Sequence, residues 1–435
     1  MNRLYIKGGV VLTMVPGQEP IEEGVVCTEA ERITYAGPAS QAPQPAGAQV
    51  IDASGCIIMP GLVNSHTHVA MSLMRGVADD LPLQTWLTEH IFPLESRITP
   101  EAVYWGSMLG CLEMIRFGTT CFCDMYLFAQ QVAAAADAMG VRAVVGEVLF
   151  DFPSPCYGEL EAGFELTREF ITHYQDHPRI TVGVMPHSLY TCSRPLLERV
   201  VELAEEMDAP INIHMAENPE ETEEVVAKWG KRPAEVALEL GLLVPRTVIN
   251  HGVDFSSDDI KLLARRDVAV AHCPESNMKL TSGIFRLTEA LEAGLRVGLG
   301  TDGPASNNNL DMLGEMDSCA KLAKLGSGDP AAAPTIQVLE LGTWRAAEAL
   351  GLKELGRLEP GALADIIAVD TSGVHMQPLH NPASTLVYAA KGSDVLHTIC
   401  HGKVLMMNRE ILVADEQEVK AKAREQARRL LEGGR

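Results

Sequence analysis

Hydrophobic and polar residues follow two different patterns along this chain. Over residues 1–58, short apolar stretches separated by turn-forming residues predict β-strands, and little of the segment has a helical period. From Met59 to about Gly351, short apolar runs alternate with longer segments in which apolar residues recur every three or four positions, as in residues 101–117. This alternation predicts βα units that build a parallel sheet.

Eight apolar runs in the middle region are candidate parallel strands. They read IIMPGLVNSHTH, GTTCFCDM, RAVVGEVLFD, ITVGVMPHS, PINIHMAE, TVINHGV, VAVAHCPESN and RVGLGTDG. Eight strands over about 290 residues fit a (β/α)8 barrel, which typically has about 250 residues. A doubly wound sheet that binds a dinucleotide would need a Gly-rich phosphate turn after an early strand, and no early run has one. The sequence therefore predicts an α/β fold with a TIM-like (β/α)8 barrel.

The two ends of the chain have the composition of a second, smaller unit. Residues 354–414 return to a strand and turn pattern, and we expect them to pair with residues 1–58 in a small β-sandwich-like module. The catalytic barrel would then span residues 59–353. Residues 415–435 carry a charged helical pattern with few apolar positions, which predicts a C-terminal surface helix.

Composition and charge exclude several classes of protein. With 46% hydrophobic and 21% charged residues, the 435-residue chain has an ordinary globular composition. Its 35 Lys and Arg against 58 Asp and Glu give a net charge of -23, which argues against binding to nucleic acid or a membrane surface. The ten cysteines form no Cys-x-x-Cys pair, and neither a signal segment nor a membrane-spanning run is present. We therefore expect a reduced, cytoplasmic protein.

Polar residues of metal-binding type recur at the ends of the predicted strands, where active sites of such barrels lie. These residues are His66, His68, His187, His214, His251, His272 and Asp302. A single buried histidine is more often a hydrogen-bonded core residue than a ligand, but several at matching strand ends argue for a shared site. His66 and His68 are two apart on a strand, so both project from one face.

The set His66, His68, His214 and Asp302 offers three imidazoles and one carboxylate. Such a set suits zinc and leaves a position for water. We therefore predict one divalent metal ion per subunit, zinc in the first place, with ferrous iron as the alternative.

With these residues the sequence resembles the amidohydrolase superfamily, and within it the methylthioadenosine/S-adenosylhomocysteine deaminase group. The resemblance covers nearly the whole chain and is carried by residues 60–95, 183–193, 211–218, 250–253, 271–283 and 298–312. Two-metal members of this superfamily have a bridging carboxylate, often a modified lysine, at the end of the fourth strand. Here residues 185–188 read MPHS, without lysine. The resemblance therefore implies a site for one metal.

The resemblance implies catalytic roles for Glu217, His251 and Asp302. Glu217 would contact a ring nitrogen of the substrate and carry a proton from that nitrogen toward the departing ammonia, work that favours a raised pKa. His251 would polarise the metal-bound water, and Asp302 would both bind the metal and accept a proton. The alternatives are a surface glutamate in an acidic loop for Glu217 and a structural role for His251.

Two further positions match substrate contacts of the group. Glu95 could accept hydrogen bonds from ribose hydroxyls, because a carboxylate has two acceptor oxygens. Its alternative is an ordinary glutamate at a helix end. His187 would contact the ribose or lie beside the metal, and His272 would lie behind the metal-binding residues without an assigned role.

Glu147 departs from the group. Many members have an arginine at this position, suited to pairing with the carboxylate of S-adenosylhomocysteine, and a glutamate would repel that carboxylate. Glu147 could instead meet the ammonium of the same substituent, or take no part.

The resemblance implies hydrolytic deamination of adenine nucleosides, through attack of metal-bound hydroxide on C6, to give the inosine analogue and ammonia. The candidate substrates are 5'-methylthioadenosine, S-adenosylhomocysteine, adenosine and 5'-deoxyadenosine. The alternatives on the same site are guanine deamination and triazine hydrolysis, and a scaffold without metal is the alternative outside enzymes. Members are often dimeric or tetrameric, so a homo-oligomer is the expected assembly.

Overall fold

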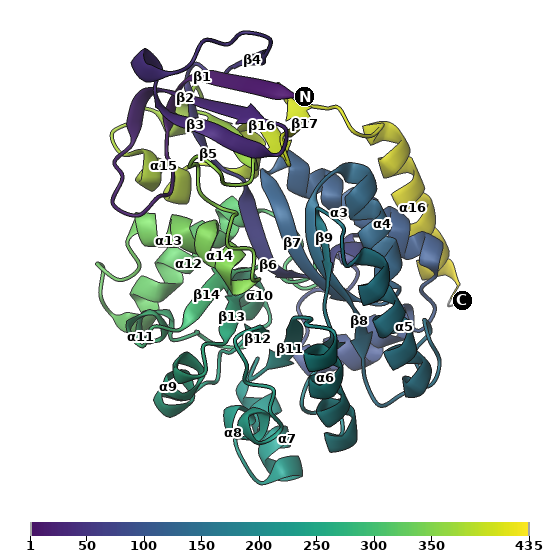
Figure 1. Ribbon diagram of the computed structural model, residues 1–435. Coiled ribbons are helices and arrows are strands. Elements are labelled where there is room, and N and C mark those ends of the chain that lie inside the picture. The colour runs from purple at the N-terminus through teal and green to yellow at the C-terminus, as the bar shows by residue number, and fades with distance from the viewer. Residues whose placement is uncertain (1, 434–435) are drawn as a thin grey trace.

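Two parallel β-sheets with helices packed around them form the larger part of the computed structural model, which describes residues 2–433 (Figure 1). The first sheet consists of β6 (Leu62–Thr67), β7 (Thr119–Tyr126), β8 (Arg142–Leu149), β9 (Ile180–Val182) and β10 (Met185–Pro186). The second consists of β11 (Ile211–Met215), β12 (Thr247–His251), β13 (Ala269–His272) and β14 (Arg296–Leu299). All eight predicted runs thus contain parallel strands, in chain order.

The two parallel sheets meet along both of their edges. On one side, isolated parallel bridges join Val184 to Ile211 and Ser188 to His214. On the other side, the backbone N–H of Asp302 donates to the carbonyl of His66 at 3.0 Å. Gly300 permits this approach, since a Cβ at that position would lie 2.7 Å from the backbone nitrogen of His66. The described strands form two hydrogen-bonded sheets, where the sequence predicted one barrel.

A third sheet of nine strands draws on both ends of the chain. Its order is β18-β17-β16-β15-β5-β1-β2-β3, with β4 paired to β1. The strands are β1 (Arg3–Val11), β2 (Ile21–Glu29), β3 (Arg32–Pro38), β4 (Gln49–Asp52), β5 (Cys56–Pro60), β15 (Ile366–Asp370), β16 (Val395–Cys400), β17 (Lys403–Met407) and β18 (Glu410–Ile411). Antiparallel pairing of β5 with β15 joins the two ends. The sheet has its own buried apolar cluster, which includes Ile6, Val26, Ile58 and Ile366.

The first predicted run is two strands rather than one. β5 belongs to the third sheet and β6 to the first parallel sheet, and Gly61 alone separates them. Its N–H donates to the carbonyl of Asp365, whereas the N–H of Leu62 donates to the carbonyl of Gly118. A Cβ at Gly61 would collide with the side chain of Thr120, so only glycine allows the chain to pass here.

Helices follow the parallel strands, as the helical periods predict. They are α3 (Pro100–Arg116), α4 (Ala129–Met139), α5 (Leu160–Tyr174), α6 (Arg194–Glu206), α7 (Pro219–Trp229), α8 (Pro233–Glu239), α9 (Ser257–Arg265), α10 (Pro274–Lys279), α11 (Leu287–Glu292), α12 (Met312–Ser327), α13 (Thr335–Leu341), α14 (Trp344–Ala349) and α15 (Pro382–Tyr388). Shorter turns are η1 (Ala39–Gln41), η2 (Val69–Met74), α1 (Leu83–Thr85), η3 (Trp86–Ile91), α2 (Phe92–Glu95), η4 (Val374–Met376) and η5 (Gly392–Asp394). The start of α7 has an Asn218 cap with proline in its first turn.

The C-terminal helix α16 (Glu416–Glu432) lies along α3 (Figure 1). Val419, Ala423 and Leu430 are buried on one of its faces, and Glu416 pairs with Arg116 of α3 at 2.7 Å. The helix is therefore attached by an apolar stripe that the charged sequence pattern concealed.

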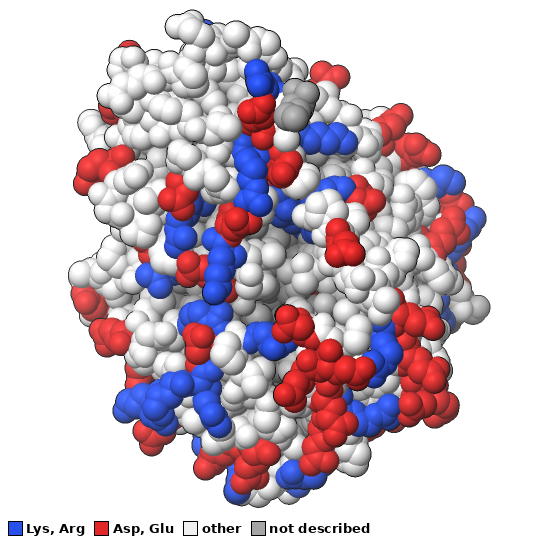
Figure 2. All heavy atoms as spheres, in the orientation of Figure 1, with Lys and Arg blue, Asp and Glu red and all other residues white. Residues whose placement is uncertain are grey.

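Acidic side chains gather over α6 and α7 on the face shown in Figure 2, in agreement with the net charge of -23. Among residues 2–433, no helix combines the length and the apolar character needed to span a bilayer.

Candidate metal and substrate site

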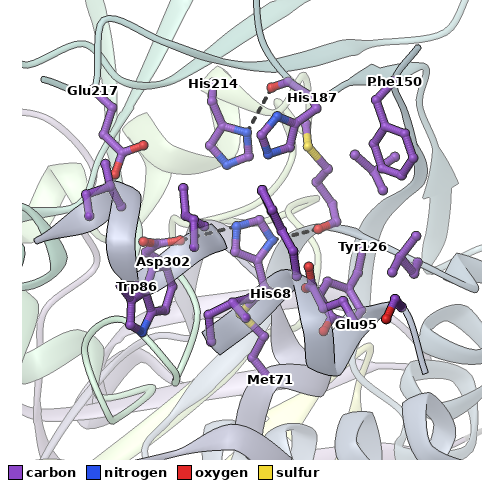
Figure 3. Close-up of a pocket in the computed structure, with 18 of the residues that line it drawn as sticks. His68, Met71, Trp86, Glu95, Tyr126, Phe150, His187, His214, Glu217 and Asp302 are labelled. Carbon is purple, nitrogen blue, oxygen red and sulfur yellow. Dashed lines mark hydrogen bonds and ion pairs between the residues drawn. The ribbon is translucent and has the colours of Figure 1, made fainter. Parts of the chain in front are cut away.

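A pocket of about 470 Å³ lies at the carboxyl ends of the parallel strands. Its walls come from the ends of β7, β8, β11 and β12 and from the loops that follow them, together with residues 83–96. His68, His187, His214, His251, Glu95, Glu217 and Asp302 all line this pocket, and Figure 3 shows most of them pointing toward one another. Chain segments that are far apart in sequence therefore contribute to one site.

The predicted metal ligands lie close together. The ligand atoms of His66, His68 and His214 are within 4.8 Å of one another, as are those of His66, His251 and Asp302. Oδ1 of Asp302 is 3.4 Å from Nε2 of His66 and 3.3 Å from Nε2 of His68. This spacing suits a single small cation held between imidazoles and a carboxylate.

Hydrogen bonds fix which ring nitrogen of His68 and of His214 faces the cluster. Nδ1–H of His68 donates to the carbonyl of Met125 at 2.6 Å, and Nδ1–H of His214 donates to the carbonyl of His187 at 2.9 Å. Because a carbonyl only accepts, Nδ1 carries a proton and Nε2 is the nitrogen that faces the cluster. His66 is fully buried, and neither of its ring nitrogens has a hydrogen-bond partner among the described residues. A bound metal ion would give one of these two buried nitrogens a partner.

Two serines hold the carboxylate of Asp302. Its Oδ2 accepts hydrogen bonds from Ser276 Oγ at 2.6 Å and from Ser306 Oγ at 2.8 Å, so Oδ1 is left to face the histidines. Burial alone would raise the pKa of Asp302, but contacts with His66 and His68 outweigh burial and hold it well below its usual range. The carboxylate is thereby ionised, as a ligand requires.

His251 ends β12 with a positive φ of 70° and turns its ring into the pocket. Its Nδ1–H donates to Oδ1 of Asn277 at 3.0 Å, which leaves Nε2 at 4.0 Å from a carboxylate oxygen of Glu217. Burial would lower the pKa of His251, but the negative charges of Glu217 and Asp302 raise it above its ordinary value.

Glu217 follows β11 and points into the pocket (Figure 3). Its side chain is only 15% exposed, so the alternative of a surface glutamate in an acidic loop is wrong. Its backbone N–H donates to Oε2 of Glu221 at 2.6 Å. Burial raises the pKa of Glu217 above its ordinary value.

Glu95 and His187 line the same pocket from different walls. Glu95 ends α2, and burial raises its pKa to about 7, against the lowering effects of Tyr126 and His68. His187 follows β10, and its Nδ1 lies 2.9 Å from Oγ1 of Thr191. Burial lowers the pKa of His187 to about 4, so the ring is neutral at pH 7.

His272 and Glu147 lie outside the pocket lining. His272 ends β13 and packs against the ring of Phe285 at a centroid distance of 5.0 Å. Glu147 lies on β8, where its two carboxylate oxygens accept the N–H groups of Phe128 at 3.2 Å and Ala129 at 2.8 Å. Of the alternatives left open for Glu147, this placement agrees with its taking no part in substrate contact, because its carboxylate caps the start of α4.

Sequence reasoning missed two groups of residues. The serines at 276 and 306 and Asn277 gave no signal, although Ser276 and Asn277 follow directly after a predicted strand end. The aromatic wall was missed as well, and it consists of Trp86, Phe92, Tyr126, Phe150, Phe152 and Tyr190. Tyr126 ends β7 and Phe150 follows β8, so the strand-end rule extended to aromatic residues would have found both.

Residues 298–303, GLGTDG, have the spacing G-x-G-x-x-G, which usually marks a phosphate-binding turn, but here the motif has another role. They follow the last parallel strand rather than an early one, and they deliver Asp302 to the histidine cluster. Gly298 and Gly300 are needed for close approach to β6, where any Cβ would meet Ser65 or His66. The motif thus serves packing and ligand placement in place of phosphate binding.

Comparisons with known proteins agree with this arrangement. The sequence profile of the amidohydrolase family matches residues 57–405. A relative from Syntrophobacter fumaroxidans named 5-methylthioadenosine/S-adenosylhomocysteine deaminase is 48% identical over 427 residues, which cover 98% of each chain.

Solved structures show the same likeness. The crystal structure of an adenosine deaminase from Xanthomonas campestris with bound zinc is 37% identical, with a TM-score of 0.96 and coverage of 99% of this chain and 98% of that one. The zinc complex of an atrazine chlorohydrolase from Arthrobacter aurescens has a TM-score of 0.92 over 98% of this chain and 100% of that one, and at 22% identity it shows the fold alone. The profile match over most of the sequence and the nearly full-length relatives show that this chain belongs to the amidohydrolase family, together with the relatives named 5-methylthioadenosine/S-adenosylhomocysteine deaminase.

Proposed function

We propose that this protein is a metal-dependent hydrolase that removes the exocyclic amine of adenine nucleosides, giving the inosine analogue and ammonia. The observation that carries the proposal is the buried cluster of three histidines and Asp302 at the base of a pocket that also holds Glu217. The names of its relatives support this reaction and this substrate class. The candidate substrates are 5'-methylthioadenosine, S-adenosylhomocysteine, adenosine and 5'-deoxyadenosine.

We propose one divalent metal ion per subunit, zinc or alternatively ferrous iron, bound by His66, His68, His214 and Asp302. One ring nitrogen from each of three histidines and one ionised carboxylate oxygen fit such an ion, and the unpartnered ring of His66 favours it. When bound, the ion would supply hydroxide at neutral pH by lowering the pKa of its water to about 7.

The side chains around the cluster would move protons. Glu217 would donate its proton to the ring nitrogen beside the reacting carbon, which makes that carbon more electrophilic. It would then take up a proton released by the attacking water and pass that proton to the departing ammonia. His251, held by Asn277, would orient the attacking water through Nε2. Asp302, whose Oδ2 is held by hydrogen bonds from two serines, would accept a proton that the attacking water releases.

The ribose would lie between Glu95 and His187. Glu95 offers two carboxyl oxygens to a pair of hydroxyls, and neutral His187 can donate or accept one further hydrogen bond. Both residues line the pocket away from Glu217, which leaves the purine between the ribose and the metal-binding residues (Figure 3).

We also propose how the fold is divided. The two parallel sheets would act as one TIM-like (β/α)8 catalytic barrel over residues 59–353, supported by the contacts at both of their shared edges. Residues 1–58 and 354–414 would form the small β-sandwich-like module, with residues 415–435 as the C-terminal helix. A cytoplasmic location, a small-molecule substrate and a homo-oligomeric state are part of the proposal.

Ammonia release from the zinc- or iron-supplemented protein tests the activity. We expect turnover of adenine nucleosides and its loss in Glu217→Gln, which should keep its metal. Activity on guanine alone would contradict the nucleoside assignment.

Metal analysis of the purified protein tests the ion site. We expect about one ion per chain in the wild type and less than about 0.1 in His66→Ala, because a ligand that is deleted from a closed set costs most of the affinity. His380→Ala is the matched control, since His380 is outside the pocket, and it should bind metal normally. A wild type without metal would favour a scaffold.

A further inference from the structure

Part of the pocket lining is an apolar wall formed by Phe150, Phe152, Pro153 and Pro155, here called the 5' wall. The rings of Phe150 and Phe152 stack with centroids 3.9 Å apart and planes 12° from parallel. Phe150 is buried, but Phe152 is 46% exposed at the pocket mouth. A large exposed aromatic ring in a pocket is typical of a surface that a ligand covers.

The 5' wall lies at the position of the 5' substituent, an assignment that rests on the proposed function. Figure 3 shows Glu217 at one end of the pocket and Phe150 at the other, with His187 between them. A nucleoside with its amine beside Glu217 and its ribose at Glu95 and His187 would direct its 5' carbon toward Phe150. The chemistry of the wall then determines which substituents fit.

The loop that carries the 5' wall is ordered by its own hydrogen bonds. Ser154 and Gly158 exchange two backbone hydrogen bonds of 2.8 Å each, and Oγ of Ser193 donates to Asp151 at 2.9 Å. Below the loop, the ring of Tyr157 packs 6.2 Å from that of Phe150. A wall held in this way is formed before the ligand arrives, so binding costs little ordering.

Among the described residues, the lining of the pocket has no lysine or arginine to pair with an anionic substituent. The acidic residues that line it are Glu95, Glu217 and Asp302. The two nearby lysines are already engaged. Lys279 bonds to Asp79 at 2.5 Å and to Asn308 at 2.7 Å, and Lys228 donates to the carbonyls of Leu189, Tyr190 and Cys192.

We propose that the 5' wall is a subsite for an uncharged, apolar 5' substituent, such as an alkylthio or methyl group, and that it discriminates against zwitterionic amino-acid substituents. An alkylthio group would cover Phe152 and exclude water from its ring. The carboxylate of a homocysteinyl group would lie beside aromatic rings and acidic residues without a partner, which costs binding energy.

Kinetics with two substrates test this specificity. We expect kcat/KM for 5'-methylthioadenosine to exceed that for S-adenosylhomocysteine by at least about tenfold, the effect of one unpaired charged group. Phe152→Arg should raise the ratio of S-adenosylhomocysteine to 5'-methylthioadenosine by about tenfold, because the guanidinium supplies the missing partner at an exposed position. The control Phe152→Gln removes the ring without adding charge and should leave S-adenosylhomocysteine turnover no better.

Calorimetric binding of both nucleosides to Glu217→Gln separates this inference from the proposed reaction. If the variant binds 5'-methylthioadenosine more tightly than S-adenosylhomocysteine but the wild-type protein releases no ammonia, the subsite is supported and the deaminase is rejected. Equal or better binding or turnover of S-adenosylhomocysteine would overturn the subsite and leave the deaminase in place. Failure of both nucleosides to bind would overturn both.

Discussion

At the scale of single residues, the site depends on side chains that no metal would touch. Ser276 and Ser306 donate hydrogen bonds to one oxygen of Asp302, and Asn277 fixes the ring of His251 by a hydrogen bond. Ser276 and Asn277 lie on α10, which follows β13, and Ser306 lies in the segment that follows β14 and also carries Asp302. Such partners commonly set ligand geometry as strongly as the ligands themselves.

Replacing Ser276 and Ser306 by alanine tests this support. Without the two donors, Oδ2 of Asp302 is free to rotate toward the metal, so we expect metal affinity or kcat/KM to fall by about 10–100-fold in the double variant. Metal titration and steady-state kinetics measure the two effects. Ser372→Ala is the control at an exposed serine, and a double variant with unchanged metal affinity and kcat/KM would show that the serines are dispensable.

The sequence is most informative where chemistry and position coincide. Histidine and aspartate are common metal ligands, so their recurrence at predicted strand ends predicts a shared site for His66, His214 and Asp302. Serine and asparagine do not have this chemical signature, so Ser276 and Asn277 carry no comparable signal. Glu147 is misleading because its residue type suggests a charge in the pocket, whereas the start of α4 lies close enough to take both of its oxygens.

At the scale of elements, Glu147 joins two neighbouring βα units. Its carboxylate, 1% exposed on β8, accepts backbone N–H groups at the start of α4, whose Phe128 cap residue has a left-handed φ of 52°. The partial positive charge of a helix start favours the anion. Burial nevertheless dominates and raises the pKa of Glu147 to about 7.

The raised pKa makes a prediction about stability and pH. In the unfolded chain Glu147 titrates near 4.5, so the folded state binds the proton more tightly, and its stabilising effect is complete below pH 4.5 and lost as pH rises through 7. Glu147→Gln removes this loss. Between pH 5 and 8 we expect its free energy of unfolding to gain about 1–3 kcal/mol relative to wild type, measured by urea titration.

The control for this measurement is Glu169→Gln on the exposed face of α5. Its difference from wild type should stay constant over the same pH range. A constant difference for Glu147→Gln as well would contradict a buried carboxyl group with a raised pKa.

At the scale of the whole molecule, a buried ion pair joins the first parallel sheet to the third sheet. Nε of Arg142, on β8, bonds both oxygens of Asp365 at 3.1 and 3.0 Å, and one Nη reaches Nδ1 of His401 at 2.9 Å. The side chain of Arg142 is 5% exposed and that of Asp365 is fully buried. The sequence pattern predicts the strands of both sheets, but nothing in it signals which charges meet between them, because the partners are more than half the chain apart.

Arg142→Met tests this junction. Removing one partner leaves a buried charge unpaired, and we expect a loss of about 3–5 kcal/mol in the free energy of unfolding. The double variant Arg142→Met/Asp365→Leu should be more stable than the single one, because no charge is left unpaired. Arg3→Met, which breaks the exposed pair with Glu29, is the control and should cost less than about 1 kcal/mol. Equal losses in all three variants would contradict the junction.

The direct connection of β5 to β6 at Gly61 also affects how this protein folds during its synthesis on the ribosome. β5, which leads directly into the first two histidines of the cluster, pairs with β15, and the partners Pro60 and Ile366 are separated by about 300 residues. One edge of β5 therefore waits unpaired while most of the chain is being made, exposed to other nascent chains. Termination of translation anywhere before β15 would leave that edge open permanently, so we expect such fragments to aggregate even when every predicted metal ligand is present.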